Sequence, residues 1–290
     1  MNFSMPALVE HLKTKGFIYS GSEIYGGLAN AWDYGHYGAM LKDNIRSAWV
    51  RAFVNTRTDM TLLDSAILMN PAVWKASGHI DGFSDPLVDC KTCKTRHRAD
   101  KLIEAATDIN PEGLEVTAFR EHYIKNHADV PSEVREGSLN DFMHYILNKH
   151  IPSPDAPTGT KPDWTPIRNF NLMFATKQGV TEDSSATVYL RPETAQGIFV
   201  NFANIARTSR KKVPFGVAQV GKAFRNEITP GNFIFRTREF EQMEIEYFAH
   251  PDEAMALYAK WIDDCEQFLL KVIGLNGEKL RRRVIGRAHV

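Results

Sequence analysis

The sequence lacks the features of a membrane or secreted protein. Its 290 residues contain no run of about 18 apolar residues and no basic and apolar signal segment at the N-terminus. Only three cysteines are present, Cys90, Cys93 and Cys265, an odd number that is too small for a disulfide scaffold. We therefore expect a cytoplasmic protein that works under reducing conditions.

The sequence also lacks an excess of either charge. Lys plus Arg and Asp plus Glu both number 35, so the formal net charge is zero. This balance does not indicate a general nucleic-acid or membrane binder, and any contact with a polyanion would use a local patch. Hydrophobic residues make up 43% of the chain. That share is ordinary for a packed protein of one large domain, or of one domain with an insertion.

The cysteines give little reason to expect a metal. Cys90 and Cys93 form a C-x-x-C pair, which is half of a structural zinc site. His97 is close in sequence, but no second pair follows at a suitable spacing. Cys265 falls within an expected helix and is interpreted as a core residue. We predict that zinc is not bound and that no metal ligand lies within this chain.

Hydrophobic periodicity predicts several helices and strands. Apolar residues recur at helical spacing over residues 5–15, 39–53 and 251–270. The stretch "MTLLDSAILMN" predicts a buried strand that runs into a turn at Pro71. Later stretches are typical of successive strands, and they read "RNFNLMFAT", "ATVYLRP", "FGVAQVGKAFRNE" and "REFEQMEIEYFAH".

The pattern changes between residues 83 and 166. Residues 100–106 and 140–148 favour helices, but "IPSPDAPTGTKPDWTP" has too many prolines for a helix or a central strand. We interpret 83–166 as an insertion into a core formed by 1–82 and 167–290. We expect the middle of this insertion to be mobile or poorly packed compared with the core.

The stretch from Lys222 to Phe248 mixes opposite charges with aromatic residues. It reads as an antiparallel hairpin with a loop around "TPGN". Side chains alternate between the faces of a strand. One face of the second strand therefore carries Phe240, Gln242, Glu244 and Glu246, and the other carries Glu239, Glu241, Met243 and Ile245.

Two interpretations of this hairpin are open from spacing alone. The charges can be a solvated sheet face, on which each cross-strand ion pair contributes at most about 1 kcal/mol. Alternatively, the face with Phe240 is a ligand site. A ring can stack on Phe240, the carboxylates suit an ammonium group or a ribose, and Arg225 on the facing strand suits a phosphate.

Motifs along nearly the whole chain favour the ligand site. "FRNE", a loop and "REFEQMEIEYF" resemble motif 2 of the class II aminoacyl-tRNA synthetases, and "YLRPETAQGIFVNF" resembles the strand that precedes it. "GFSDPLVDC" with "RHRADKL" and the N-terminal "FIYSGSEIYGGLANAWDYGHYGAMLKDNIRSAW" are similar to glycyl-tRNA synthetases of the dimeric type. The resemblance implies an α+β fold, with an antiparallel sheet flanked by helices and a helical or irregular insertion.

The resemblance also implies an ATP site. Arg225 would hold the α-phosphate and stabilise the charge that develops there, and Phe240 would lie under the adenine ring. Asn226 and Glu227 would add contacts. The remaining expected ATP contacts are Phe235, Arg236, Thr237, Arg238 and Glu239. From the pattern alone, Arg236 and Arg238 are equally consistent with a solvated strand edge.

The glycine site implied by the resemblance is built from carboxylates. Glu193 in "RPET" and Glu244 in "EQME" would face the substrate ammonium, with Glu241 beside them. Arg98 in "HRAD" would reach the same site. Phe240, Gln242 and Met243 complete the expected set. Without the resemblance, the pattern favours Glu193 as a helix cap and Arg98 as an exposed charge on the insertion.

The implied function is glycine–tRNA ligation, with ATP, glycine and tRNA(Gly) as substrates and Mg²⁺ as cofactor. A homodimer would form through the motif 1 region, although "YGHYGAMLKDN" lacks the proline usual in that motif. Nothing in the chain resembles motif 3 or an anticodon-binding domain. We therefore expect a fragment of a longer synthetase, with the Mg²⁺ ligands beyond residue 290. The alternative is a catalytically inactive, synthetase-like dimerisation or binding module.

Overall fold

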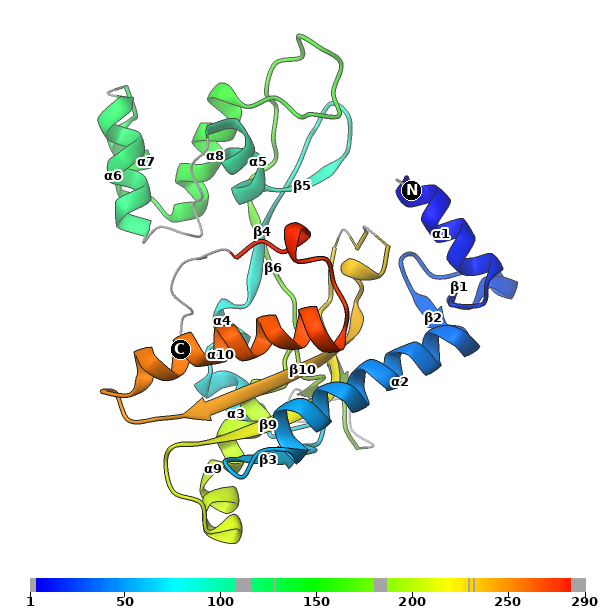
Figure 1. Ribbon diagram of the computed structural model, residues 1–290. Coiled ribbons are helices and arrows are strands. Elements are labelled where there is room, and N and C mark those ends of the chain that lie inside the picture. Colours follow the sequence, from blue (N-terminus) through cyan, green and yellow to red (C-terminus); the bar gives the residue numbers. More distant parts are fainter. Residues whose placement is uncertain are drawn as a thin grey trace. The chain divides into compact units, whose positions relative to one another are not determined.

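The computed structural model describes residues 4–107, 116–127, 129–179, 187–228, 230–231 and 233–282. The chain forms two compact units. The larger unit comprises Met1–Ile80 and Leu172–Arg283, and the smaller comprises Asp81–Asn171 and Val284–Val290. These divisions fall close to the expected ones at 82/83 and 166/167, and the identification of the smaller unit as an insertion stays a prediction. Figure 1 labels the elements of both units.

A three-stranded sheet organises the larger unit. Its order is β10-β9-β3. Strand β9, Phe215–Phe224, is central; β10, Glu239–Phe248, is antiparallel to it, and β3, Met60–Leu63, is parallel to it. Because β9 is covered on both faces, its first five residues are all buried and read as a nearly continuous apolar run.

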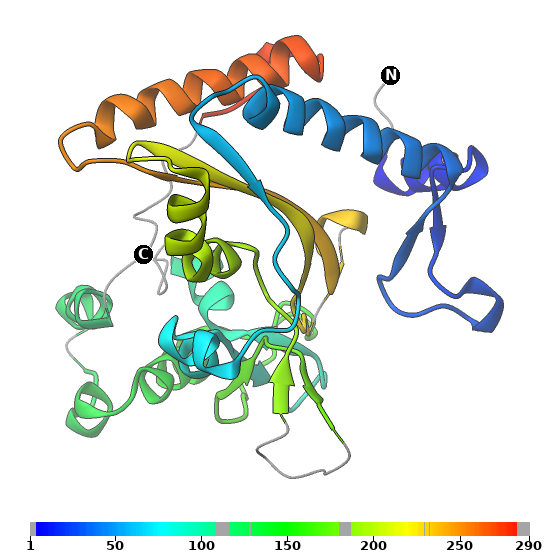
Figure 2. The same cartoon turned by 90° about the horizontal axis from the view of Figure 1, so that it is seen from below.

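Two long helices cover one face of this sheet, and both run on into a π-helical turn. Helix α2, His36–Val50, continues as Arg51–Asn55, and α10, Ala254–Gln267, continues as Phe268–Val272. Figure 2 shows these two helices side by side over the sheet. The buried residues that join them to it are Trp49, Phe53, Val54, Met60, Ala218 and Phe268.

Helix α9, Ala195–Ser209, covers the other face. Ile198 of α9 is fully buried against Phe215 and Val217, with Phe202 and Phe248 packed around them. The helix follows a two-stranded sheet of β7, Ala175–Lys177, and β8, Thr187–Tyr189. The segment between β8 and α9 runs beside the end of β9 that leads into the hairpin loop, where the Phe224 amide donates to the Arg191 carbonyl oxygen at 2.9 Å.

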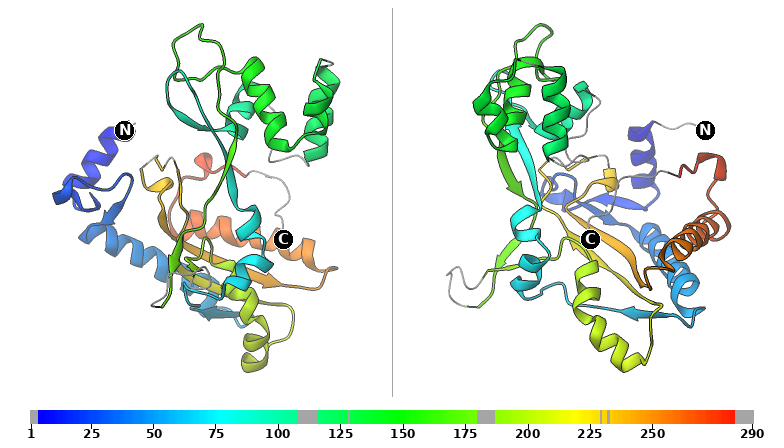
Figure 3. Two further views of the ribbon diagram at one scale, coloured as in Figure 1. Left: turned by 180° about the vertical axis from the view of Figure 1, so that it is seen from behind. Right: turned by 90° about the vertical axis from the view of Figure 1, so that its left-hand side faces the viewer.

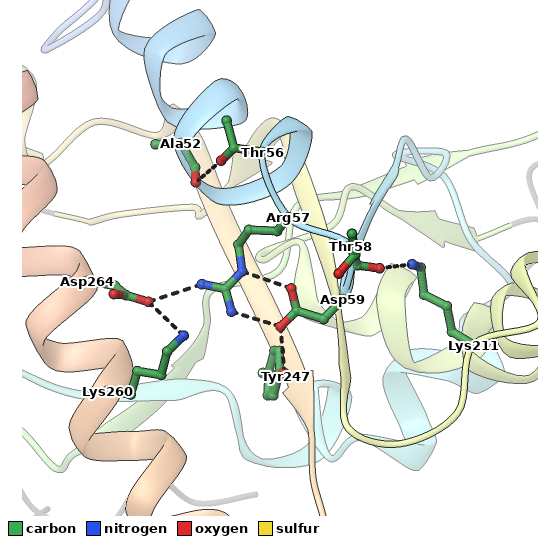
Figure 4. A network of polar contacts seen from close by, with 9 residues as sticks. All are labelled: Ala52, Thr56, Arg57, Thr58, Asp59, Lys211, Tyr247, Lys260 and Asp264. Carbon is green, nitrogen blue, oxygen red and sulfur yellow. Dashed lines mark hydrogen bonds and ion pairs between the residues drawn. The ribbon is translucent and has the colours of Figure 1, made fainter.

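A partly buried polar network ties α10 to the sheet (Figure 4). Arg57 donates from Nε and Nη2 to the two Asp59 carboxylate oxygens at 3.0 and 2.8 Å, and from Nη1 to Asp264 of α10 at 3.1 Å. Tyr247 of β10 donates to Asp59 at 2.8 Å. These donors hold the pKa of Asp59 at about 2. The network fixes the position of α10 against the sheet at the end remote from the hairpin loop.

The N-terminal part of the larger unit contains short elements. Helix α1, Met5–Thr14, precedes the antiparallel pair β1, Ile18–Ser20, and β2, Trp32–Tyr34, with a 3-10 turn at Glu23–Tyr25. Asn30, just before β2, donates to the carbonyl oxygen of Arg236 at 2.5 Å. The side chain of Trp32 meets Phe233 edge-on at 5.1 Å. These contacts attach the N-terminal hairpin to the loop between β9 and β10.

The smaller unit has its own sheet and core (Figure 3). Strand β4, Ser84–Asp89, pairs antiparallel with β5, Arg96–Arg98, and β6, Arg168–Asn171. Its helices are α5, Ala99–Thr107; α6, Val116–Asn126; α7, Ser132–Glu136; and α8, Leu139–His150. Phe119, Phe142, Ile146 and Leu147 have no exposed surface. Poor packing is therefore wrong for the described helices of this unit, because α6 and α8 bring large apolar side chains together. Residues 108–115, in the middle of the expected insertion, lie outside the described residues, and the expected mobility stays a prediction.

Other expectations also need correction. Pro71 does not make a turn; it begins α3, Pro71–Ala76, where a proline fits because the first helical N–H needs no partner. Asn70 caps this helix by accepting from the Ala72 amide at 2.9 Å. Cys265 is exposed on α10 and is not a core residue.

None of the helices in the described part of the chain has the length and apolar character needed to cross a bilayer.

Candidate functional site

One face of the β9–β10 hairpin is polar, as the alternation of side chains predicts. The register places Phe240 opposite Ala223, Gln242 opposite Gly221, Glu244 opposite Gln219 and Glu246 opposite Val217. Residues paired in an antiparallel register point to the same face. The small residues Gly221 and Ala223 leave room above β9 for neighbouring side chains, and the Arg191 guanidinium occupies the space above Gly221.

The segment between β8 and α9 brings two further groups to this face. Thr194, which is fully buried, donates its hydroxyl hydrogen to a carboxylate oxygen of Glu244. Glu193 accepts from the amide of Gln196 at 2.8 Å and lies 3.4 Å from Nε2 of His79. His79 above all, and then Gln196 and Arg225, lower the pKa of Glu193. Glu193 and Glu244 are thus fixed in place by neighbouring donors.

Glu246 is the third carboxylate of this group. Its pKa is raised to about 7, first by burial and then by the negative charges of Glu244 and Glu193. Glu246 therefore keeps its proton more readily than an ordinary glutamate, and the three neighbouring carboxyl groups form an anionic cluster. A bound cation would offset this repulsion and favour the ionised form of Glu246. This end of the site therefore suits a small ammonium group.

Arg225 lies directly after β9, beyond the carboxylates. Its backbone amide donates to the carbonyl oxygen of Arg238 at 2.9 Å, which continues the hairpin pairing. Its side-chain Nε donates to the carbonyl oxygen of Pro192 at 3.1 Å. The guanidinium carbon lies 5.4 Å from the centre of the Phe240 ring. A planar cation held over an aromatic ring suits an anion such as a phosphate, next to a flat group that stacks on the ring.

A buried arginine supports this arrangement. Arg191 is only 2% exposed, and it donates to the carbonyl oxygens of Lys222 at 2.7 Å and Ser65 at 2.8 Å. Ser65 in turn donates to Oε1 of the buried Gln219 at 3.0 Å. A Cβ atom on Gly221 would lie 2.3 Å from the Arg191 guanidinium, so glycine is needed there. Arg191 thereby holds the segment with Glu193 against β9.

The loop between β9 and β10 gathers around Glu227. Arg236 pairs with the Glu227 carboxylate at 2.7 Å, and Arg238 donates to the Glu227 carbonyl oxygen at 2.9 Å. Asn226 is held through its backbone amide, which donates to the carbonyl oxygen of Leu172 at 2.8 Å. Phe235 is 69% exposed. The side chains of Arg236 and Arg238 thus fold back onto Glu227, which lies two residues after Arg225 in the sequence.

Three of the expected site residues lie on the opposite face of β10. Glu241 pairs with Lys42 of α2 at 2.6 Å, and Glu239 pairs with Lys222. Met243 belongs to an apolar cavity of about 470 Å³ between β10, α2 and α10. The structure therefore does not bring Glu239, Glu241 and Met243 together with Glu244. Thr237, next to them in the loop, donates from its hydroxyl to the Glu239 carbonyl oxygen at 2.7 Å.

Arg98 lies in the smaller unit. Its guanidinium pairs with the buried carboxylates of Asp85 at 2.9 Å and Asp100 at 2.7 Å. It is a well-anchored side chain and not the loose surface charge that its sequence context alone would favour. Two carboxylate partners fix the direction in which the guanidinium is presented.

Known proteins share these motifs and this fold. Residues 176–288 match the family model described as tRNA synthetase class II core domain (G, H, P, S and T). Glycine–tRNA ligases of Ureaplasma urealyticum and Acetivibrio thermocellus are 52% and 54% identical to the chain over 275 and 280 residues. The chain is a class II tRNA synthetase homologue. A prolyl-tRNA synthetase structure from Cryptosporidium parvum shares the fold, with 9% identity and a TM-score of 0.50.

Each match covers most of this chain but a smaller share of the matched protein. They include 95% and 97% of this chain but only 53% and 56% of the two ligases. The prolyl-tRNA synthetase match covers 93% of this chain and 35% of that one. The chain therefore spans about half the length of the curated relatives that it matches. Its class II core fold is the fold expected from the motifs, although the central sheet flanked by helices is mixed, with β10 antiparallel and β3 parallel to β9.

Several groups of this class II core were not identified from the sequence as site residues. Thr194 directly follows Glu193, and Glu246 lies on the same strand face as Glu244. The sequence could therefore have identified both as site residues. His79 and Arg191 carried no such signal, because only the fold brings them to the hairpin. Gln219 lies on β9 itself, opposite Glu244, and was not singled out. In the described part of the chain, no three His, Cys, Asp or Glu side chains are grouped so that they could hold a metal ion.

Proposed function

We propose that the whole protein is a glycine–tRNA ligase, which activates glycine with ATP and transfers it to tRNA(Gly). Similarity to glycine–tRNA ligases over nearly the whole chain supports this proposal. The observation that carries it is the division of the site into two ends. Glu193, Glu244 and Glu246 form an anionic end, and Arg225 over Phe240 forms a cationic end with an aromatic platform.

This division fits glycyl-adenylate formation. The ammonium group of glycine would bind among Glu193, Glu244 and Glu246, so that its carboxylate points toward Arg225. A glycine carboxylate oxygen attacks the α-phosphorus of ATP, and the bond to the pyrophosphate oxygen breaks. Arg225 would stabilise the negative charge that builds on the α-phosphate oxygens during this displacement. Neither bond change requires a protein nucleophile, so positioning and electrostatics suffice.

The expected nucleotide contacts lie around the hairpin loop. Phe240 would stack under the adenine ring, and Asn226, Glu227, Phe235 and Thr237 would line its edge and the ribose. We retain Arg236 and Arg238 in this proposal, since their present partner, Glu227, belongs to the same loop. Mg²⁺ would neutralise charge on the phosphates, and the described residues of this chain offer no cluster of ligands for it.

Acyl transfer would complete the reaction. A ribose hydroxyl at the terminal adenosine of tRNA(Gly) attacks the carbonyl carbon of the adenylate, and AMP leaves from it. The residues that hold the ammonium would keep the carbonyl in position during this second step. Arg98 is retained as a proposed glycine contact, and its two carboxylate partners provide the rigidity that such a contact needs.

A homodimer through the motif 1 region is part of the proposal. Three large side chains on α2 are exposed, Tyr37 at 53%, Met40 at 62% and Leu41 at 50%. Apolar groups that recur on one helix and stay exposed are typical of a surface that a partner covers. A second copy of the chain would bury them.

The decisive experiment is ATP–pyrophosphate exchange by the full-length protein with each of the twenty amino acids. We expect exchange that depends on glycine and is at least about a hundredfold slower with alanine or serine. Exchange driven by another amino acid would assign a different substrate to the same core. Absence of exchange with every amino acid would instead support an inactive, synthetase-like binding module.

A further inference from the structure

The turn between β4 and β5 of the smaller unit carries both cysteines of the C-x-x-C pair. Cys90 is 3% exposed and packs into the core of this unit, whereas Cys93 is partly exposed. The backbone amide of Cys93 points at Sγ of Cys90, at 3.4 Å. The turn closes through Lys94, whose amide donates to the Cys90 carbonyl oxygen at 3.0 Å and whose φ is 62°. The two thiols therefore lie on the same side of one tight turn.

Two hydroxyl groups lie against the more exposed thiol. Sγ of Cys93 is 2.9 Å from Oγ1 of Thr95 and 3.3 Å from Oγ of Ser153. Ser153 is 6% exposed and comes from the segment that follows α8. Hydroxyl hydrogens at these distances can be donated to a thiolate sulfur, and a donated hydrogen bond stabilises the ionised form.

A histidine and a carboxylate stand behind the hydroxyls. Nε2 of His97 lies 3.0 Å from Oγ1 of Thr95, 3.4 Å from Oγ of Ser153 and 3.2 Å from Oδ2 of Asp155. A chain of contacts therefore runs from the Cys93 thiol through a hydroxyl to an imidazole and then to a carboxylate. This order of groups can accept the thiol proton and keep it within the cluster.

The segment that supplies Ser153 and Asp155 is anchored to the cysteine turn. The backbone amide of Lys91 donates to the carbonyl oxygen of Asp163 at 2.9 Å. The backbone amide of Thr165 donates to the carbonyl oxygen of Asp89 at 3.0 Å. The buried indole of Trp164 donates to the Ile151 carbonyl oxygen at 2.7 Å and meets the His97 ring edge-on at 5.7 Å. The hydroxyls and the imidazole are therefore held at the thiol by the core of the unit.

We propose that Cys93 and Cys90 form a thiol–disulfide exchange site, with Cys93 as the attacking thiol and Cys90 as the resolving one. The substrate class is a small disulfide such as oxidised glutathione. The exposed sulfur meets the reagent first, and the buried sulfur is reached only from within the turn. The site lies within the smaller unit and uses none of the residues proposed for aminoacylation.

Both steps of the exchange balance. The Cys93 thiolate attacks one sulfur of the small disulfide, so that a mixed disulfide forms and one small thiolate leaves. Cys90 then loses its proton and attacks Sγ of Cys93, which expels the second thiolate. The protein loses two thiol hydrogens and gains one sulfur–sulfur bond. The small disulfide is reduced to two thiols, which carry the two protons.

The ionisation of Cys93 is consistent with this role. The hydrogen bonds to Ser153 and Thr95 lower its pKa to about 6, so the thiolate predominates at neutral pH. Partial desolvation by neighbouring side chains, and then the negative charge of Asp264, raise the pKa of Cys265, the third cysteine, although the residue as a whole is exposed. Cys265 is exposed and has no such cluster, and it is therefore an internal control for thiol reactivity.

The test is to treat the full-length protein, stripped of metals with a chelator, with oxidised glutathione at pH 7. Alkylation and peptide mass spectrometry then locate the modified cysteines. We expect an internal disulfide between Cys90 and Cys93, and reaction of Cys93 about five- to tenfold faster than that of Cys265. Cys90→Ser should trap the glutathione adduct on Cys93. Ser153→Ala should slow the reaction severalfold and shift its pH midpoint upward.

Three outcomes would overturn the proposal. Cys93 could react no faster than Cys265, which would show that the cluster does not activate it. The wild-type protein could keep glutathione on Cys93, which would show that Cys90 does not resolve the adduct. One zinc ion per chain that protects both thiols before chelation would make the pair a metal site. Because the wild-type protein alone distinguishes these outcomes, the test stands even if a variant fails to fold.

Discussion

The two faces of β10 carry similar residues and have different surroundings. On one face Glu244 and Glu246 lie beside Glu193, and no lysine or arginine forms an ion pair with Glu244 or Glu246 in the described part of the chain. On the other face Glu239 and Glu241 each pair with a lysine. The glutamate charges are thus neutralised by lysines on the face with Glu239 and Glu241, whereas on the face with Glu244 and Glu246 they repel one another.

This difference separates structural charges from charges that need a ligand. Paired surface carboxylates contribute little, and their removal is tolerated. Neighbouring carboxylates without a cation cost stability, and the cost is removed when a cation binds. Strand alternation assigns each glutamate of β10 to one of these two roles. The predictions below test this assignment, in order of decreasing effect.

Arg225→Ala should have the largest effect on catalysis. Loss of a donor that stabilises charge in the transition state costs about 10²–10³ in rate. We expect this loss in glycine-dependent ATP–pyrophosphate exchange by the full-length protein, with an unchanged circular dichroism spectrum. The matched control is Lys222→Ala on the same strand, whose side chain pairs with Glu239 on the other face. Equal losses in both variants would refute the distinction between the faces.

Ile245→Ala should affect stability and leave the site intact. Ile245 packs against the cluster of Trp49, Phe53 and Phe268 on the face covered by α2 and α10. Truncation of a buried isoleucine costs 2–5 kcal/mol, and we expect about 2 kcal/mol here because Ile245 is only partly buried. Urea unfolding measures this loss. The KM for glycine in the folded variant should stay within about twofold of wild type, whereas a large rise in KM would contradict the assignment.

The smallest expected effect is the pH dependence of stability and of glycine affinity that the titration of Glu246 causes. Its pKa in the folded protein is raised to about 7, above the ordinary value of 4.5, so the folded state retains a proton that the unfolded state loses. Stability should therefore fall as pH rises from about 4.5 to 7, by on the order of 1 kcal/mol once the shift is discounted for the solvent screening of a half-exposed group. Glycine affinity should change in the opposite sense and rise up to about tenfold between pH 6 and 8, since the carboxylate binds the ammonium.

Glu246→Gln is the variant that checks this linkage. It should flatten both pH profiles, because a neutral amide neither titrates nor repels Glu244. Unfolding measured by urea at pH 5, 6, 7 and 8 gives the first profile, and calorimetric titration with glycine gives the second. If the wild type and the variant show the same slope in both profiles, Glu246 is not the group that titrates.

Much of the larger unit could be predicted from the sequence. Strands β9 and β10 follow from their apolar pattern, and their alternation already divided Glu244 from Glu241. The strand with "RNFN" was wrongly grouped with the others, because it pairs with β4 in the smaller unit. Periodicity identifies a strand, but it does not say which strand lies beside it.

The candidate site was predictable only where one short segment contains its residues. Arg225, Phe240, Glu193 and Glu244 lie in motifs that can be read directly. Groups such as His79 and Arg191 were not identified, because their role depends on contacts with residues more than 30 positions away. The packing of the smaller unit was underestimated for a related reason. Its prolines suggested looseness, whereas the sequence does not show that Trp164 is buried by the core.

The central claim is tested most directly by Glu244→Gln and Glu241→Gln in the full-length protein. The two residues are three positions apart on β10 and undergo the same chemical change, but they lie on opposite faces. Calorimetry measures the Kd for glycine in both variants. We predict that Glu244→Gln weakens binding by about ten- to a hundredfold, as expected for loss of a charge-assisted contact, and that Glu241→Gln changes it less than about twofold. Equal effects, or a larger effect of Glu241→Gln, would contradict the account.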